Sequence, residues 1–127
     1  MVAKFDWYRS ASYDAHQKQQ FHRHARARLK ALAVELKFPP GSFDLRSNAG
    51  GIAVSGEITL HHDAVYIQVC QPATGWGSGI MIRTCKGRRD YTGGANNFVP
   101  LRMLDDPSAL ADRVRSILGP QHTSRAA

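Results

Sequence analysis

The sequence contains few cysteines, few aromatic residues and no long apolar run. Its two cysteines, Cys70 and Cys85, are too few for the disulfide framework of a small secreted scaffold, and neither belongs to a Cys-x-x-Cys pair. No stretch approaches the ~18 consecutive apolar residues of a membrane span, and residues 1–10 lack the apolar segment of a secretory signal. These absences predict a reduced, cytoplasmic protein that does not bind a membrane.

Sequence motifs for metal binding and for the common types of catalysis are also missing. The six histidines include no His-Glu-x-x-His motif, and the chain has neither a Gly-x-Ser-x-Gly turn nor a Walker phosphate loop. We therefore expect no metal and no cofactor. A small phosphodiester-acting enzyme is kept as a hypothesis, and its candidate groups are Asp90, Tyr91, Arg88, Arg89 and either His61 or His62.

What the chain has in excess is positive charge. Its 127 residues carry 17 Lys and Arg against 10 Asp and Glu, which gives a net charge of +7. Residues 12–38 hold six cations and two acids, and residues 83–90 hold four cations and one acid. A basic surface favours partners that carry phosphate. The length and the 43% hydrophobic content predict one folded domain over residues 1–120, followed by a disordered tail at 121–127.

The first basic segment predicts an N-terminal amphipathic helix. Its apolar face repeats at spacings of three and four and consists of Phe21, Ala25, Leu29, Leu32 and Leu36. The run Phe38-Pro39-Pro40-Gly41 ends the helix. At about 3.6 residues per turn the cations form one separate stripe, made of Arg23, Arg26, Lys30 and Lys37. This stripe is a candidate phosphate-contacting surface, and a plain solvated face is the alternative.

The middle of the chain changes to the alternating period of β-strands. Four strands are expected, at residues 43–47, 52–60, 65–70 and 80–85. Their short connections favour an antiparallel meander, and His61-His62-Asp63 is typical of a turn. Asp106 and Pro107 are a typical N-cap and first position of a C-terminal helix. The predicted fold is α+β, with both helices covering the apolar face of a four-stranded antiparallel sheet.

This order of elements is similar to that of the double-stranded-RNA-binding domain, which has three strands. That family carries a lysine-rich motif at the start of its last helix, where this chain reads Asp105-Asp106-Pro107-Ser108. The resemblance therefore covers only the order of elements, and no functional residue is carried over from it.

Alternation predicts which side chains lie on the second face of the sheet. They are Glu57, Thr59, Tyr66, Gln68, Met81 and Arg83. If no helix covers that face, it is a polar platform like those of RNA-binding sheets, although with fewer aromatic residues; a plain solvated face is the alternative. The same counting places Arg83 beside Tyr66, and it places Cys70 and Cys85 at opposite ends of one hairpin. Both thiols should therefore be free.

The most unusual stretch is a long Gly-rich basic loop that follows the fourth strand. Its glycines let main-chain amides approach an anion, and Arg88 and Arg89 can grip phosphate with a fork of N–H groups. The rings of Tyr91 and Phe98 can stack on bases. An ordinary solvated connection is the alternative. In the preceding loop, Trp76 is a candidate anchor for a protein partner.

These features together predict a nucleic-acid-binding accessory protein that contacts the phosphate backbone of DNA or RNA. One alternative is a protein-interaction or inhibitor module that docks on an acidic partner, and another is the phosphodiester-acting enzyme. The candidate nucleic-acid-binding residues are Arg23, Arg26, Lys30, Lys37, Arg83, Lys86, Arg88, Arg89, Tyr91, Asn96, Asn97 and Phe98.

Overall fold

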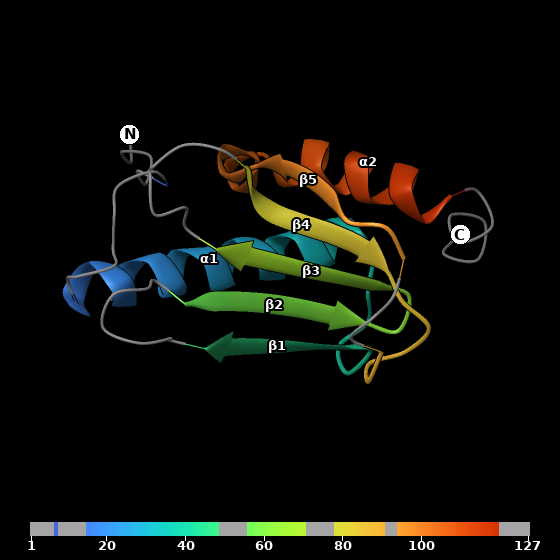
Figure 1. Cartoon of the computed structure of the whole chain (residues 1–127), viewed down its shortest axis with the longest axis horizontal. Helices are drawn as coiled ribbons and strands as arrows, with labels where there is room; N and C mark the ends of the chain where they lie inside the picture. Colours follow the sequence, from blue (N-terminus) through green and yellow to red (C-terminus); the bar gives the residue numbers. More distant parts are fainter. Residues whose placement is uncertain (1–6, 8–14, 49–55, 71–77, 91–93, 120–127) are drawn as a thin grey trace.

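The structure is a computed structural model in which two helices cover one face of an antiparallel sheet (Figure 1). It describes Trp7 and residues 15–48, 56–70, 78–90 and 94–119. The elements in chain order are α1 (Ala15–Glu35), β1 (Phe43–Asn48), β2 (Glu57–His62), β3 (Val65–Cys70), β4 (Ser78–Thr84), β5 (Asn97–Pro100), a 3-10 helix η1 (Leu101–Asp105) and α2 (Pro107–Leu118). The strands lie side by side in the order of the chain, and each neighbouring pair is antiparallel.

The predicted α+β class, the two helices and the antiparallel meander are confirmed, but the predicted number of four strands is wrong. A fifth strand, β5, includes Asn97 and Phe98, which were expected in the loop. β5 has four residues, and Val99 is its only buried side chain. So short a segment shows no alternation that could be recognised in the sequence. The predicted loop is therefore shorter, and Phe98 stands on the sheet.

The second strand also differs from its prediction. It was expected at residues 52–60, of which 52–55 lie outside the described residues, and the structure gives Glu57–His62. His61 and His62, which were predicted to form a turn, extend the strand because they pair with Asp44 and Phe43 of β1. The expected C-terminal tail at 121–127 also lies outside the described residues.

The core forms where the apolar face of α1 meets the inner face of the sheet. All five residues predicted for the helix face are buried, as are Ile58, Leu60, Ile67, Ile80 and Ile82 from the strands. Trp7 packs edge-on against Phe21 with ring centroids 6.1 Å apart. The helix ends through Lys37, which takes a left-handed φ of 61°, and through a bond from Phe38 N–H to Ala33 O.

The start of α2 agrees with its prediction. Asp106 caps the helix by accepting a hydrogen bond from the Ala109 N–H at 3.1 Å, and Pro107 occupies the first helical position. The helix packs on β4, whereas α1 packs on β2. Among the helices that the structure describes, none has the length and apolar character needed to cross a membrane.

Candidate functional site

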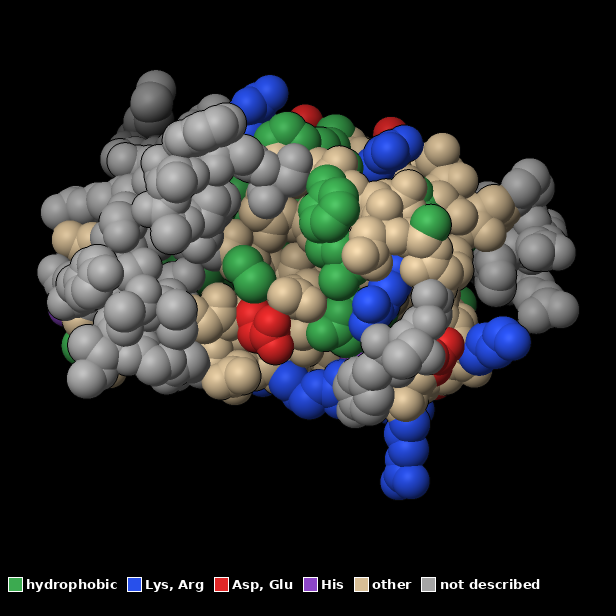
Figure 2. Space-filling view, viewed as in Figure 1, with side chains coloured by type: hydrophobic (Ala, Val, Ile, Leu, Met, Phe, Trp, Pro, Cys, Tyr) green, Lys and Arg blue, Asp and Glu red, His purple; other side chains and the backbone are tan. Residues whose placement is uncertain are grey.

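Neither helix covers the outer face of the sheet, which we call the open face (Figures 1 and 2). The strand register arranges its side chains in three rows that run across the strands. The first row is Asp44, His61, Tyr66 and Arg83. The second row is Arg46, Thr59, Gln68, Met81 and Phe98. The third row is Asn48, Glu57 and Cys70. All six residues predicted for this face from alternation lie in these rows, and Arg83 is directly opposite Tyr66 as expected.

The centre of the open face is apolar. Phe98 on β5 is 58% exposed and lies opposite Met81 on β4. Figure 2 shows a band of hydrophobic side chains across the middle of this face, with an acidic group to its left and basic groups to its right and below. A contiguous apolar patch rimmed by polar and charged groups is typical of an interaction surface. Phe98 presents an exposed aromatic ring within this patch.

The ring of Tyr66, unlike that of Phe98, is covered by neighbouring side chains. The guanidinium carbon of Arg83 lies 4.5 Å from the ring centroid of Tyr66, which is the geometry of a cation–π contact. The other side of the tyrosine meets His61 edge-on, with centroids 5.0 Å apart. Burial raises the pKa of Tyr66, and the carboxylate of Glu57 adds to the rise. The neutral tyrosine thus holds the Arg83 guanidinium at the surface of the open face.

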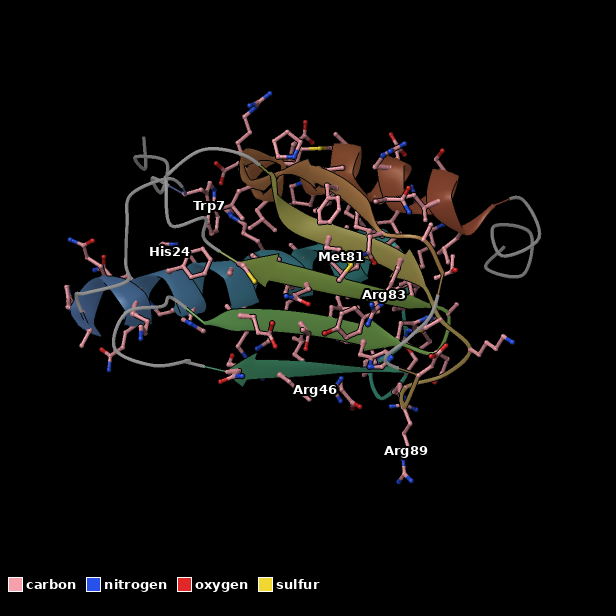
Figure 3. The ribbon with its side chains drawn as sticks, in the orientation of Figure 1. Trp7, His24, Arg46, Met81, Arg83 and Arg89 are labelled. Atoms are coloured by element: carbon pink, nitrogen blue, oxygen red, sulfur yellow. The ribbon has the colours of Figure 1, made fainter. Side chains whose placement is uncertain are left out.

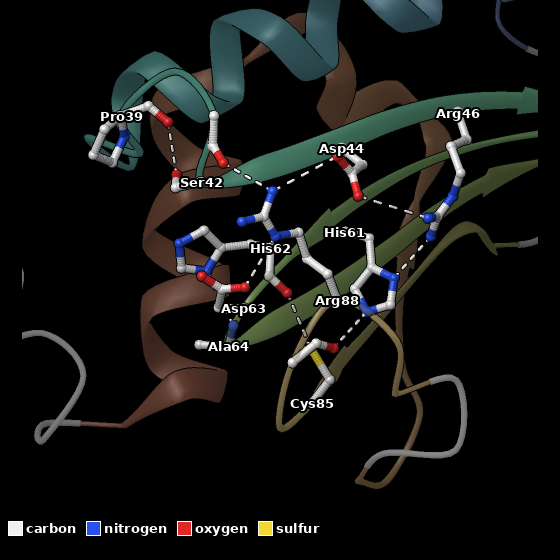
Figure 4. Close-up of polar contacts among 12 residues, drawn as sticks. Pro39, Ser42, Asp44, Arg46, His61, His62, Asp63, Ala64, Cys85 and Arg88 are labelled. Atoms are coloured by element: carbon white, nitrogen blue, oxygen red, sulfur yellow. Dashed lines mark hydrogen bonds and ion pairs between the residues drawn. The ribbon is translucent and has the colours of Figure 1, made fainter.

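His61 joins the open face to the loop that follows β4 (Figure 4). Its side chain is fully buried. Its Nδ1 accepts a hydrogen bond from the Arg46 Nη2 group at 2.8 Å, and its Nε2 lies 2.9 Å from the carbonyl oxygen of Gly87. Since a carbonyl can only accept, the proton of the neutral ring is on Nε2. Burial lowers the pKa of His61, and the nearby Arg46 lowers it further against the effect of the Gly87 bond.

Local hydrogen bonds hold the described parts of the loop that His61 anchors. The Asp90 N–H also donates to Gly87 O at 3.1 Å, and the Asp90 carboxylate accepts from the Lys86 N–H at 2.9 Å. At the far end, the Gly94 N–H donates to Thr84 O at 2.9 Å. A Cβ at Gly94 would stand 2.5 Å from Thr84 Oγ1, so a larger residue here would force the Thr84 side chain to move.

The two arginines of the loop have different surroundings. Arg88 points inward: its Nε donates to Asp63 Oδ1 at 3.1 Å and its Nη1 to Gly41 O at 2.8 Å, with the Asp44 carboxylate 3.7 Å away. Its fork of donors therefore joins the β2–β3 turn to the start of β1. Arg89 extends away from the molecule beyond β1 (Figure 3), and within the described residues no acid pairs with it. The cation that the loop offers to a partner is thus Arg89, together with the exposed side chain of Lys86.

Arg23, Arg26 and Lys30 of the predicted stripe lie on the side of α1 that faces away from α2. Lys37 follows the end of the helix and is not part of it. Arg28 marks the opposite side, because it forms an ion pair with Asp105 of η1 at 3.6 Å. At ~100° per residue, Lys30 lies roughly opposite Arg28 around the helix axis, and Arg23 and Arg26 flank Lys30. At the same ~100° per residue, the stripe is more than a quarter turn from the buried face of α1 and so points away from the sheet. Arg46 and Arg89 extend at the β1 edge (Figure 3).

The remaining candidate residues differ in their exposure and contacts. Asn96 is exposed, whereas the Asn97 amide donates to Ile82 O at 3.2 Å and to Ala95 O at 3.1 Å and so supports the start of β5. Tyr91 and Trp76 lie outside the described residues. Cys70 and Cys85 are free thiols, as predicted, and burial raises the pKa of both.

The two histidines suggested for phosphodiester chemistry make contacts that support the fold. Both ring nitrogens of His61 are engaged. The ring of His62 stacks on Phe38 at 3.8 Å, and its Nδ1 accepts from the Ala64 N–H at 3.1 Å. Across the described part of the chain, no three His, Cys, Asp or Glu side chains gather in a metal-binding cluster. Among the described residues, these contacts do not bring a nucleophile together with a base.

Comparison of the chain with protein-family models, with characterised proteins and with solved structures gives no match. Function is therefore inferred from the open face, the loop and the basic edge. Of the residues predicted to bind a partner, the fold brings Arg83 and Phe98 onto the open face. It brings Arg89 to the β1 edge beside that face (Figure 3).

Proposed function

We propose that this protein binds single-stranded nucleic acid across the open face of its sheet. The observation that carries the proposal is the pairing of an exposed aromatic ring with a fixed guanidinium on one uncovered surface. Phe98 is 58% exposed on β5, and Arg83 is held over Tyr66 on the neighbouring strand β4. Aromatic rings on an open sheet stack on unpaired bases, and adjacent cations hold the phosphates.

The distribution of charge supports a phosphate partner. The chain carries a net charge of +7, and several of its cations lie on or beside the open face, while others, such as Arg102 and Arg113, lie elsewhere on the surface. Arg46 and Arg83 stand on the face itself, and Lys86 and Arg89 extend the positive region along the loop. Arg46 and Arg89 extend at the β1 edge (Figure 3). A nucleic-acid strand that leaves the face at β1 therefore meets positive charge there.

The shape of the surface favours a single strand over a duplex. The second row crosses five strands, which is about 19 Å at ~4.8 Å per strand gap, and Phe98 stands at one end of it. A base pair inside a duplex has its faces covered by its neighbours, so it cannot stack on Phe98. An unpaired base is free to do so. The proposal includes both DNA and RNA.

The test is a fluorescence-anisotropy titration with single-stranded and duplex oligonucleotides of about 12 nucleotides, repeated over a series of salt concentrations. Phe98→Ala should weaken single-strand binding by about 5- to 150-fold, which corresponds to the ~1–3 kcal/mol of one stacked base. Val34→Ala is the matched control, because Val34 is the other large exposed apolar side chain among the described residues, at 76%, and lies on α1.

Two results would contradict the proposal. One is equal affinity of wild type and Phe98→Ala for the single strand. The other is tighter binding of the duplex, or of an acidic polypeptide such as poly-glutamate, than of the single strand. Either result would mean that the cations act without the open face.

A further inference from the structure

We infer that the open face selects bases by their exocyclic amino groups, and that Glu57 is the residue that reads them. This inference rests on the proposed function and adds a specificity to it. The ligand class that it names is single-stranded nucleic acid rich in cytosine, as opposed to uracil, which carries a carbonyl oxygen where cytosine carries its amino group.

The first observation is that the charge on the open face changes sign along the direction of the strands, from positive near the first row to negative at the third. The guanidinium of Arg83 lies in the first row, and Arg46 reaches from the second row toward the first through its bond to His61 at 2.8 Å. Glu57 lies in the third row, between Asn48 on β1 and Cys70 on β3, which carry no charge that would neutralise it. His61 and Glu57 are four residues apart on β2, or about 13 Å along the strand.

This direction fixes how a nucleotide lies on the face. Its phosphate is drawn to the two guanidinium groups and is repelled by the carboxylate of Glu57. The phosphates therefore follow the side of the first row, and the bases extend toward the third row. Phe98, in the second row, supplies a stacking surface that accepts any base. Base selection then falls to the polar groups that the base edges meet, which are those of Gln68 and Glu57.

The second observation is the chemistry of these two side chains. Glu57 is half-buried, and its carboxylate oxygens can only accept hydrogen bonds. Gln68 is held in one orientation, because its Oε1 accepts from the Tyr66 hydroxyl at 3.4 Å and its Nε2 donates to Cys70 Sγ at 3.3 Å. One N–H and one lone pair of this amide remain for a ligand. A fixed amide beside a carboxylate suits a base edge that presents an amino group next to an acceptor.

Cytosine matches this pair and uracil does not. The N4 amino group of cytosine donates to a carboxylate, and its N3 accepts from an amide. In the same orientation, uracil places its O4 carbonyl against the Glu57 carboxylate and its N3–H against the Gln68 N–H, so both contacts are mismatched. The discrimination comes from this mismatch as much as from the matching bond.

The experiment measures binding of oligo(dC) and oligo(dU) of about 12 nucleotides near neutral pH. These two oligonucleotides share backbone and methylation state and differ at the edge that Glu57 is proposed to read. Wild type should prefer oligo(dC) by about 5- to 100-fold, the range of one good side-chain–base pair. Glu57→Gln should bring the ratio close to one, both by weakening oligo(dC) and by strengthening oligo(dU).

Two further variants separate specificity from charge and from stacking. Glu35→Gln makes the same chemical change at an exposed position on α1, so it should leave the preference for oligo(dC) intact. Phe98→Ala should weaken both oligonucleotides and preserve their ratio. Equal affinity of wild type for the two oligonucleotides, or an unchanged ratio in Glu57→Gln, would overturn the inference while the proposed function stands. Failure of wild type to bind either oligonucleotide at low salt would overturn the proposed function itself.

Discussion

Acidification should destabilise the protein through His61, because the native state holds this ring neutral. Its side chain is fully buried, Arg46 donates to its Nδ1, and burial lowers its pKa below the ordinary value of 6.5. The unfolded chain therefore takes up a proton on His61 at a higher pH than the native state does. The stabilising contribution is complete above about pH 6.5 and is lost as the pH falls below it, until the native ring also protonates.

The size of the effect is limited by one proton. A single histidine changes the free energy of unfolding by at most ~1.4 kcal/mol per pH unit, so the loss between neutral pH and pH 5 is at most about 2 kcal/mol. The substitution His61→Phe keeps the ring and removes both hydrogen bonds. Gly87 O keeps its bond from the Asp90 N–H, and Arg46 keeps the Asp44 carboxylate at 3.8 Å. We therefore expect His61→Phe to cost roughly 1–3 kcal/mol at neutral pH.

The assay is urea unfolding followed by circular dichroism at about pH 7.5 and about pH 5, the range in which an unfolded-state histidine titrates. The stability difference between the two pH values should be smaller in His61→Phe than in wild type. His24 has a lowered pKa for the same main reason, burial, so His24→Gln is measured in parallel to separate its share. If wild type and His61→Phe lose the same stability on acidification, protonation of His61 is not linked to folding and its site does not favour the neutral ring.

Two further predictions concern the core and the loop. Leu32→Ala should lower the free energy of unfolding by roughly 2–5 kcal/mol, because Leu32 is fully buried beneath the sheet. Val34→Ala, two residues away and exposed, should change it by less than about 0.5 kcal/mol. Equal melting temperatures of wild type and Leu32→Ala would show that the helix face is misassigned. Arg89→Ala should reduce the slope of log affinity against log salt by about 0.7, the value of one phosphate contact on a single strand. Arg113→Ala on α2 removes an exposed cation far from the open face and should leave the slope unchanged. Equal slopes in wild type and both variants would exclude a phosphate contact at Arg89.

The elements that the sequence predicted well are those whose signal is local. The buried face of α1 follows from side-chain spacing alone. β3 has the predicted bounds of Val65–Cys70, and the capping pair Asp106-Pro107 starts α2. Alternation also placed six residues on the open face, because a strand has a period of two whatever its neighbours are. The candidate surface could therefore be recognised before the structure was known.

Other features depend on which segments the fold brings together. β5 forms because Val99 and Phe98 pair with Ile80 and Met81 of β4. Its four residues are too few for a strand to be predicted from the alternation of their side chains. Arg88 was a candidate for phosphate contact, but folding places Asp63 and Gly41 within reach of its donors. These partners lie 25 and 47 positions away in the chain, so no local pattern could reveal them.

The tertiary structure also decided the part played by each aromatic or ring side chain. Tyr66 and Phe98 both lie on the open face, yet Arg83 covers the first and leaves the second 58% exposed. His61 reads in the sequence as a turn residue, but pairing with β1 carries it into a buried site between Arg46 and Gly87. Periodicity fixes the face on which a side chain stands, because it depends on the local backbone. Exposure and hydrogen bonding depend on neighbours distant in sequence, and only the fold supplies those.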